Sequence, residues 1–447
     1  MAKDGVFLLI NFQPWLSVFL FLCAMAKTSR NSMFGRIDWV MVLLYLVLTT
    51  IGWLHIWSAS FLEDAPSPFS MANEAGRQFV WMGISFVGAS LIMLTDAKLF
   101  PAIRWILWGL SMVLLASVLV IGQDVAGNKS WIVISGNIKI QPSEFAKYTT
   151  ALILSGYIGR QEFNGKRWQD WGWSFLIILF PAVFILLQDD LGSTLVFFSF
   201  FLALFRFGLT WFWLILAVIL AATFILSLVI EPLYIAITVM GLAVISRLFS
   251  LRSPWILWVF TLLIGAFISA FAFTGQMLFS KLKPTHQNRL LVLLDPTRDP
   301  RGQGWNVTNS KMALSGGGVA GKGFMKGTLT QLKFVPKQHT DFIFSAIGEQ
   351  WGFMGTTVLV SLFLTLMVKV ILAAERQKTN FARVYGYCVA SVLFFHFFMN
   401  IGTAIGLVPT VGVPLPFISY GGSSLLGFTV LLFTFIRMDA HNSISLR

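Results

Sequence analysis

Charged residues are scarce in this sequence, and cysteines are almost absent. Asp, Glu, Lys and Arg together make up only 11% of the 447 residues, whereas 57% are hydrophobic. A soluble protein of this length needs far more polar side chains to cover its surface, which excludes a soluble domain. The two cysteines, Cys23 and Cys388, both lie in apolar runs, so neither a disulfide framework nor a cysteine metal site is expected. This composition is typical of a membrane protein.

Long apolar runs recur along the chain, and they can cross a hydrocarbon core of roughly 30 Å as helices. Only helices and closed β-barrels can satisfy all their backbone hydrogen bonds within lipid. The short alternating segments of a membrane β-barrel are lacking here, which leaves helices. We therefore predict an all-α polytopic membrane protein, a helical bundle of ten or more, about twelve, transmembrane helices with a large extracytoplasmic loop. The expected crossings are 38–58, 78–95, 104–122, 143–158, 172–187, 191–206, 209–229, 233–247, 255–273, 350–372, 384–408 and 417–436.

Acidic residues are few, 19 against 32 Lys and Arg, which gives a net charge of +13. This excess does not indicate nucleic-acid binding, because most cations stand in short connectors beside apolar runs. Cations concentrate in alternate connectors, which the positive-inside rule places in the cytoplasm. The long loop then lies outside the cell. Its own positive charge is compatible with this, because connectors of that length are translocated largely regardless of charge.

Composition divides the chain into five parts. These are an N-terminal extension (1–35), membrane helices (36–274), a large extracytoplasmic loop (275–341), further membrane helices (342–437) and a cytoplasmic tail (438–447). The extension is apolar, but polar residues interrupt it and it lacks a positively charged start, so a cleaved signal peptide is not expected. Either an extra or interfacial helix or a true start at Met33 fits the extension.

The long loop is polar and strongly basic. Before Asp341 it carries only two acids, Asp295 and Asp299, so its surface should attract anions such as a negatively charged, lipid-borne substrate. Its cations are Lys281, Lys283, Arg289, Arg298, Arg301, Lys311, Lys322, Lys326, Lys333 and Lys337.

Asp341 ends the loop directly before an apolar Phe-Ile-Phe run. A carboxylate at such a partly dehydrated edge gains basicity, which suits a general base. Because Asp341 also stands where a helix begins, a helix N-cap explains it equally well. The neighbouring His339 is expected to be a hydrogen-bonding residue rather than a metal ligand, since no second His or Cys lies at ligand spacing.

Other polar groups interrupt the apolar runs on the same outer side. Glu144 and Lys147 share one helix face, either as a structural ion pair or as the lining of a wet cavity. Lys129 is expected at the membrane interface. Asp189 and Asp190 either hold a divalent cation or mark a helix start.

Glycines in the loop and interruptions in the last helices are further features that we expect on the outer side. Glycines from Gly302 to Gly327 lie among the loop lysines, where their amides could cradle a diphosphate or where they could simply give a flexible loop. No intact nucleotide-binding motif occurs. Asn400 and Ser419 belong to segments that interrupt the last two helices. The backbone N–H and C=O groups of such segments need hydrogen-bond partners from the protein or from a water-filled cavity.

At these residues the chain resembles the shape, elongation, division and sporulation (SEDS) family of polytopic peptidoglycan polymerases. The resemblance covers about residues 36 to 437, and it is closer to the elongation member than to the division member because of residues 321–332. It depends on the motifs at 141–147, 287–302, 310–323, 339–342 and 413–422.

The resemblance implies a glycosyltransferase that polymerises lipid II on the outer face of the bacterial cytoplasmic membrane and releases undecaprenyl diphosphate during cell elongation. It implies a class B penicillin-binding protein and the cell-elongation machinery as partners. Asp341 matches the essential aspartate of the family, the expected base, and Glu144 and Lys147 match its paired cavity charges. No cofactor is firmly expected, although Mg or Mn could assist. The remaining substrate-binding or cavity candidates are Lys129, Asp190, Arg289, Lys311, Lys322, His339, Asn400 and Ser419.

Two departures from the family pattern stay open at this point, and so does the function. The family usually has Pro where this chain has Asp189, and it typically has ten crossings, whereas 207–275 holds about two more. A lipid II flippase would also need charges and broken helices in the membrane. A division-specific polymerase would fit the same features, and a scaffold that only recruits a penicillin-binding protein is a third possibility.

Overall fold

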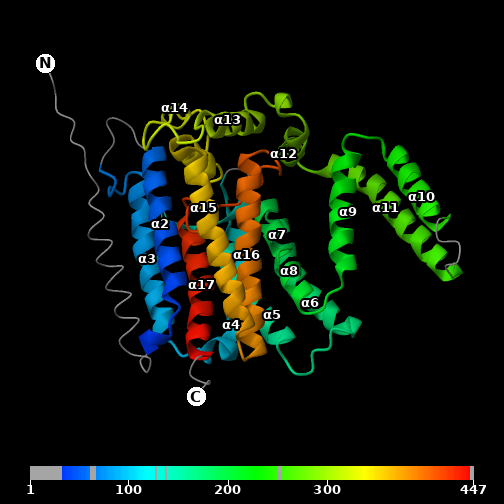
Figure 1. Cartoon of the computed structure of the whole chain (residues 1–447), viewed down its shortest axis with the longest axis horizontal. Coiled ribbons are helices and arrows are strands. Elements are labelled where there is room, and N and C mark those ends of the chain that lie inside the picture. Colours follow the sequence, from blue (N-terminus) through cyan, green and yellow to red (C-terminus); the bar gives the residue numbers. More distant parts are fainter. Residues whose placement is uncertain (1–32, 61–66, 126–127, 136–137, 249–253, 443–447) are drawn as a thin grey trace.

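The structure is a computed structural model that describes residues 33–60, 67–125, 128–135, 138–248 and 254–442. Its main body is a bundle of helices (Figure 1). After a short 3₁₀ turn, η1 (Met33–Arg36), the bundle contains α2 (Trp39–Ser60), α3 (Glu74–Leu94), α4 (Leu99–Ile121), α5 (Pro142–Ile158), α6 (Trp168–Leu187), α7 (Leu191–Phe197), α8 (Phe200–Arg206), α15 (Ile343–Glu375), α16 (Asn380–Ala404) and α17 (Gly422–Asn442). The N-terminal extension predicted at 1–35 lies almost wholly outside the described residues.

Every predicted crossing coincides with a helix, which confirms the all-α polytopic membrane fold. Within the described residues, eight helices are long and apolar enough to span a membrane, namely α2, α3, α4, α6, α11, α15, α16 and α17. The other predicted crossings are shorter helices, and the run at 191–206 is divided between α7 and α8. The apolar runs were therefore interpreted correctly as helices.

Helix α5 lies inside the bundle, where it packs against α4, α6, α16 and α17. Small and hydroxyl side chains, including Thr150, Ala151 and Ser155, are buried along it and let its neighbours approach closely. Ser111 of α4 and Thr149 share a hydrogen bond of 2.7 Å. By contrast, α3 and α4 expose large apolar side chains to the surroundings, as helices in contact with lipid do.

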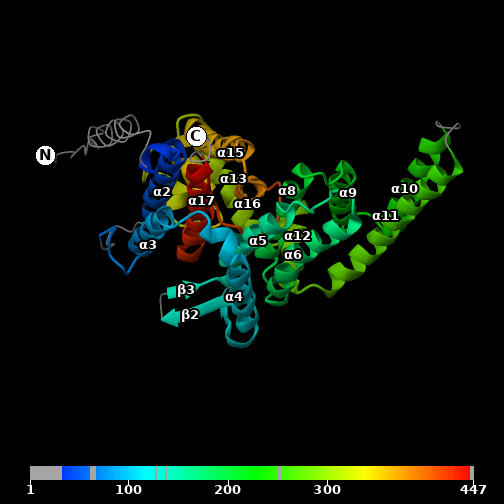
Figure 2. The same ribbon diagram turned by 90° about the horizontal axis from the view of Figure 1, so that it is seen from below.

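Three helices leave the main body between α8 and the loop. They are α9 (Trp211–Ser227), α10 (Pro232–Leu248) and α11 (Trp255–Lys281), and Figure 2 shows α10 and the start of α11 projecting away from the bundle. α10 packs on α11, and α11 packs on α9. This excursion accounts for the surplus of helices expected at 207–275. Helix α11 continues to Lys281, past the predicted loop boundary at 275.

A small antiparallel sheet follows α4, in a segment for which no strand was predicted. Its strands are β1 (Gln123–Val125), β2 (Asn128–Ser135) and β3 (Ile138–Ile140), in the order β1-β2-β3. Val133 pairs with Lys139, and β2 also contacts α4 and α5. The sheet leads directly into the start of α5.

The loop lies across one end of the bundle, at the top of Figure 1. It contains α12 (Pro284–Leu294), the 3₁₀ turn η2 (Pro296–Arg298), α13 (Gln303–Gly316) and α14 (Thr328–Gln331). A separate small core holds it together, made of Val292, Val307, Ala313, Val335 and Phe342. The loop is therefore a packed lid over the bundle, and its charged side chains have fixed positions.

The glycines at 317–323 pack against the start of α15. The amides of Lys322 and Gly323 donate to the carbonyl oxygens of Glu349 and Gln350 at 3.0 and 2.9 Å. Gly352 has φ +63 and breaks α15 next to this contact, where a Cβ would lie 2.4 Å from the Gly321 nitrogen. The expected phosphate cradle is wrong for these two amides, because protein carbonyls already occupy them.

Candidate active site at the loop and the broken segment

The backbone around Asp341 is fastened to the connector between α16 and α17, residues 405–421, which we call the broken segment. The Tyr420 amide donates to the His339 carbonyl at 2.8 Å, and the Ser419 hydroxyl donates to the Thr340 carbonyl at 2.6 Å. Asn400 of α16 donates to the carbonyl of Asp341 itself at 3.0 Å. Three successive carbonyls are thus held, which fixes the main chain at the predicted catalytic acid.

The carboxylate of Asp341 faces the broken segment. A Cβ on Gly412, which has φ +76, would lie 3.8 Å from Asp341 Oδ2. Burial raises the pKa of Asp341, while the cations Lys337 and Arg289 and the His339 ring pull that pKa down. Desolvation has the larger effect, so the carboxylate is more basic than a free aspartate.

The alternative of a helix cap at Asp341 is wrong. The N-cap position of α15 is Phe342, and no side chain forms a cap hydrogen bond there. His339 stands beside Asp341, with its ring edge-on to Tyr420 at 5.7 Å between centroids. Burial lowers the pKa of His339. His339 is thus a neighbour of the acid, and its expected role as a hydrogen-bonding residue stays a prediction.

Arg289 and Lys311 line one cleft between the loop and the broken segment. The side chain of Arg289 is buried, and its Nε has no hydrogen-bond partner within the described structure. Lys311 is exposed, and it passes so close to Gly406 that a Cβ there would lie 2.3 Å from Lys311 Cε. The other lining residues are Val292, Leu293, Pro296, Val307, Gly406, Val408, Pro409 and Thr410. An anion in this cleft would meet two cations, and one of them, Arg289, also lowers the pKa of Asp341 through its charge.

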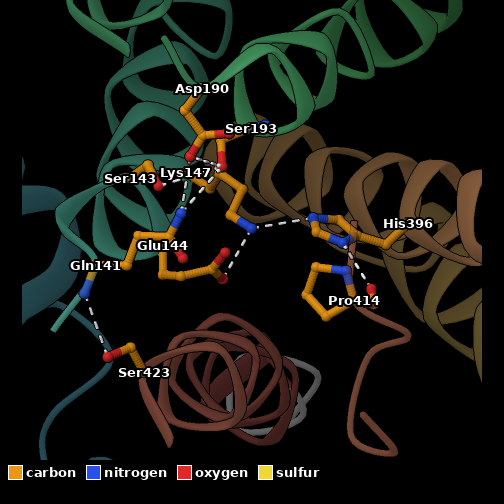
Figure 3. A network of polar contacts seen from close by, with 9 residues as sticks. All are labelled: Gln141, Ser143, Glu144, Lys147, Asp190, Ser193, His396, Pro414 and Ser423. Carbon is orange, nitrogen blue, oxygen red and sulfur yellow. Dashed lines mark hydrogen bonds and ion pairs between the residues drawn. The ribbon is translucent and has the colours of Figure 1, made fainter. Parts of the chain in front are cut away.

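Glu144 and Lys147 form a buried ion pair, 2.8 Å apart, each with a side chain only 3% exposed (Figure 3). Lys147 also donates to Nε2 of His396 at 3.0 Å, and Nδ1 of His396 contacts the Pro414 carbonyl at 3.0 Å. The pairing predicted from their spacing is confirmed. A water-filled cavity beside the pair stays a prediction.

Asp190 begins a helix, which is the simpler of its two predicted roles. Its side chain accepts from the Ser193 amide at 3.0 Å at the start of α7, from the Ser193 hydroxyl at 2.9 Å, and from Gln141 at 2.8 Å (Figure 3). Asp189 pairs with Lys283 at 2.5 Å. Because amide and hydroxyl donors and an ammonium already surround these carboxylates, they do not fit a divalent cation.

The replacement of the usual proline by Asp189 has a direct conformational consequence. Asp189 has φ +62, whereas a proline ring holds φ near −65°. The turn between α6 and α7 therefore has a shape that proline cannot adopt. The Lys283 contact ties this turn to the start of the loop.

Two predicted binding residues have other surroundings. Lys322 donates to Glu349 at 2.9 Å and to Thr328 at 2.7 Å. Glu349 is fully buried and also accepts from the amides of Leu329 and Thr330, so Lys322 holds the loop in place. Lys129 is exposed on β2. Neither ammonium is paired with Asp341.

His396 is the main residue that sequence reasoning missed. A single histidine within an apolar helix was a detectable signal, because ionisable groups in membrane segments are costly and usually paired. The sequence could not show its partners, since Lys147 and Pro414 lie far from it along the chain. The contacts of Gln141 with Asp190 and of Glu349 with Lys322 were missed for the same reason.

Comparison with known proteins agrees with this site and fold. The cell cycle protein family FtsW/RodA/SpoVE matches residues 38–256 and 224–444, and the two matches overlap within the excursion of α9 to α11. The chain is 31% identical over 406 residues to the peptidoglycan glycosyltransferase MrdB of Escherichia coli K12, covering 89% of this chain and 93% of that protein. It is 29% identical over 430 residues to the peptidoglycan glycosyltransferase RodA of Treponema pallidum, covering 90% and 96%.

Solved structures show the same architecture. A chain of a peptidoglycan synthase complex that coordinates polymerization and crosslinking is 26% identical, with a TM-score of 0.67 over 91% of this chain and 98% of that chain. The rod shape determining protein RodA of Thermus thermophilus is 24% identical, with a TM-score of 0.59 over 91% and 97%, which supports the fold alone. The chain therefore belongs to the FtsW/RodA/SpoVE family, the SEDS family of its sequence resemblance.

Proposed function

We propose that this peptidoglycan glycosyltransferase polymerises lipid II into glycan strands during cell elongation, with Asp341 as the general base. One observation carries the proposal: a carboxylate of raised pKa stands on a main chain fixed by three hydrogen bonds, near the cationic cleft of Arg289 and Lys311. A base with a raised pKa accepts protons more readily, and a fixed base is held in the orientation that reaction requires.

In the proposed reaction a hydroxyl of the acceptor sugar attacks the anomeric carbon of the donor. The hydroxyl proton passes to the Asp341 carboxylate as the new carbon–oxygen bond forms. The bond from the anomeric carbon to the diphosphate breaks, and undecaprenyl diphosphate leaves with the bonding electrons. Arg289 and Lys311 stabilise the negative charge that develops on the diphosphate.

The surroundings of Asp341 also bear on the metal question. Lys337 and Arg289 act on its carboxylate, and cations in these positions oppose a divalent ion there. We therefore assign stabilisation of the diphosphate charge to the cleft cations Arg289 and Lys311. In this proposal a Mg or Mn ion, where one takes part, arrives bound to the lipid diphosphate and has no ligands at Asp341.

We place the loop and Asp341 on the outer side of the bacterial cytoplasmic membrane, because cations concentrate in the connectors at the opposite end. The solved peptidoglycan synthase complex supports a crosslinking partner. We propose that this partner is a class B penicillin-binding protein, which joins the nascent strands as they leave the site.

The test is polymer formation by the purified protein in vesicles, with fluorescent lipid II supplied at the outer surface. Asp341→Asn keeps the shape and removes the base, so the rate should fall by about 10²–10⁴-fold. Asp295→Asn is the matched control, because this exposed loop acid contacts only its own turn. Polymer formation near the wild-type rate by Asp341→Asn would remove Asp341 from the role of base.

A further inference from the structure

His396 is a buried histidine whose two ring nitrogens have different partners (Figure 3). Nδ1 lies 3.0 Å from the Pro414 carbonyl, which can only accept a hydrogen bond, so Nδ1 carries the proton. Nε2 therefore presents a lone pair, and the Lys147 ammonium donates to it at 3.0 Å. The ring is a neutral link between the ion pair of α5 and the broken segment.

Asn400 repeats this arrangement one helical turn later on α16. Its side-chain amide donates to the Val413 carbonyl and to the Asp341 carbonyl, both at 3.0 Å. Thr403 extends the row by donating to the Pro409 carbonyl at 3.3 Å. One face of α16 thus holds three carbonyls of the broken segment and the main chain of Asp341.

Within the broken segment, the amides of Ile418 and Ser419 donate to the Leu415 carbonyl, whereas side chains of α16 bind the carbonyls of Val413 and Pro414. Pro409, Pro414 and Pro416 have no N–H, so they cannot form the regular hydrogen bonds of a helix or sheet. Gly412 stands in this segment against the Asp341 carboxylate. A shift of the Val413 and Pro414 carbonyls would therefore also move the neighbouring Gly412, whose main chain lies against the Asp341 carboxylate.

We infer that His396 is a positioning residue, which sets the place of the Asp341 carboxylate by anchoring the Pro414 carbonyl while Lys147 fixes its ring. The inference rests on the proposed function of Asp341. His396 itself is buried beneath the broken segment and acts through Pro414. Its loss should lower the catalytic rate while substrate affinity stays nearly constant.

Two substitutions separate the two halves of the link. His396→Asn places an amide nitrogen near the position of Nδ1, so it keeps the bond to Pro414 and gives up the contact with Lys147. His396→Gln reaches the position of Nε2, so it keeps an acceptor for Lys147 and gives up Pro414. His396→Leu is similar in size and loses both contacts.

The experiment measures kcat and KM for lipid II polymerisation, with thermal unfolding as a check that each variant is folded. We expect His396→Leu and His396→Gln to lower kcat by about tenfold or more with little change in KM, since small displacements of a catalytic group are costly. His396→Asn should retain several-fold more kcat than His396→Gln. If His396→Leu does not fold, the comparison of Asn with Gln carries the test alone.

Equal or higher kcat in the Gln variant, or a loss confined to KM, would overturn the inference. Unchanged kcat in the Leu variant would do the same. These results are distinct from failure of the proposed function, which Asp341→Asn reports separately. An enzyme that needs Asp341 but is indifferent to the choice between Asn and Gln at His396 refutes only the positioning role.

Discussion

Removal of Lys147 tests whether the ion pair in the bundle behaves as a truly buried pair. Lys147 and Glu144 are 2.8 Å apart, and both side chains are 3% exposed. Among the described residues, no other cation lies within ion-pair distance of Glu144. Lys147→Met keeps most of the length and packing of the side chain but leaves the carboxylate uncompensated, which should cost about 3–5 kcal/mol of stability.

The double variant Glu144→Gln/Lys147→Met should recover most of this loss. Removing both charges of a buried pair is often nearly neutral, because the desolvation cost disappears together with the attraction. Recovery should be incomplete, since Nε2 of His396 also loses its donor, which costs about 1 kcal/mol.

Thermal unfolding of the purified protein in detergent measures the effect, and the single variant should unfold several degrees below the wild type. Lys283→Met is the control, because the Lys283–Asp189 side chains are 59% and 33% exposed and such pairs contribute about 0–1 kcal/mol. The reasoning fails if Lys147→Met unfolds no earlier than Lys283→Met. It also fails if the double variant is no more stable than Lys147→Met.

Two further predictions concern Asp341, the proposed base, and the broken segment. The acid limb of the rate profile should lie above the ordinary value of 3.8, because burial raises the pKa of Asp341. Lys337→Met should move this limb to still higher pH by removing a cation that lowers that pKa, whereas Lys326→Met should leave it unchanged; a downward shift would contradict the account. Gly52→Ala should lower the unfolding temperature, since its Cβ would lie 2.6 Å from the main chain of the broken segment. Gly109→Ala, with open space around it, should not, and equal effects would refute the contact.

The sequence predicted the helices well because a membrane makes the pattern simple. Apolar runs long enough to cross lipid can only be helices or closed barrels, so their positions follow from hydropathy. The strands at 123–140 were not predicted, since they are short and lie in a connector. The N-cap role of Asp190 was one of two interpretations, and only the contacts with Ser193 and Gln141 decided between them.

Local spacing predicted the site where its partners are close along the chain. Glu144 and Lys147 are three residues apart on one helix, so their pairing could be expected. The amides of residues 322–323 illustrate the opposite case. Their glycine-rich surroundings suggested a phosphate cradle, but the start of α15 occupies those amides, and this packing has no signature in the loop itself.

The sequence by itself determined that this chain is a multi-pass membrane protein with an acid at the end of a basic loop, because hydropathy and charge act locally along the chain. The tertiary structure alone decided what holds that acid. Asn400, Ser419 and His396 reach carbonyl groups that no local pattern pairs with them, since hydrogen bonds between distant segments exist only after the helices have packed.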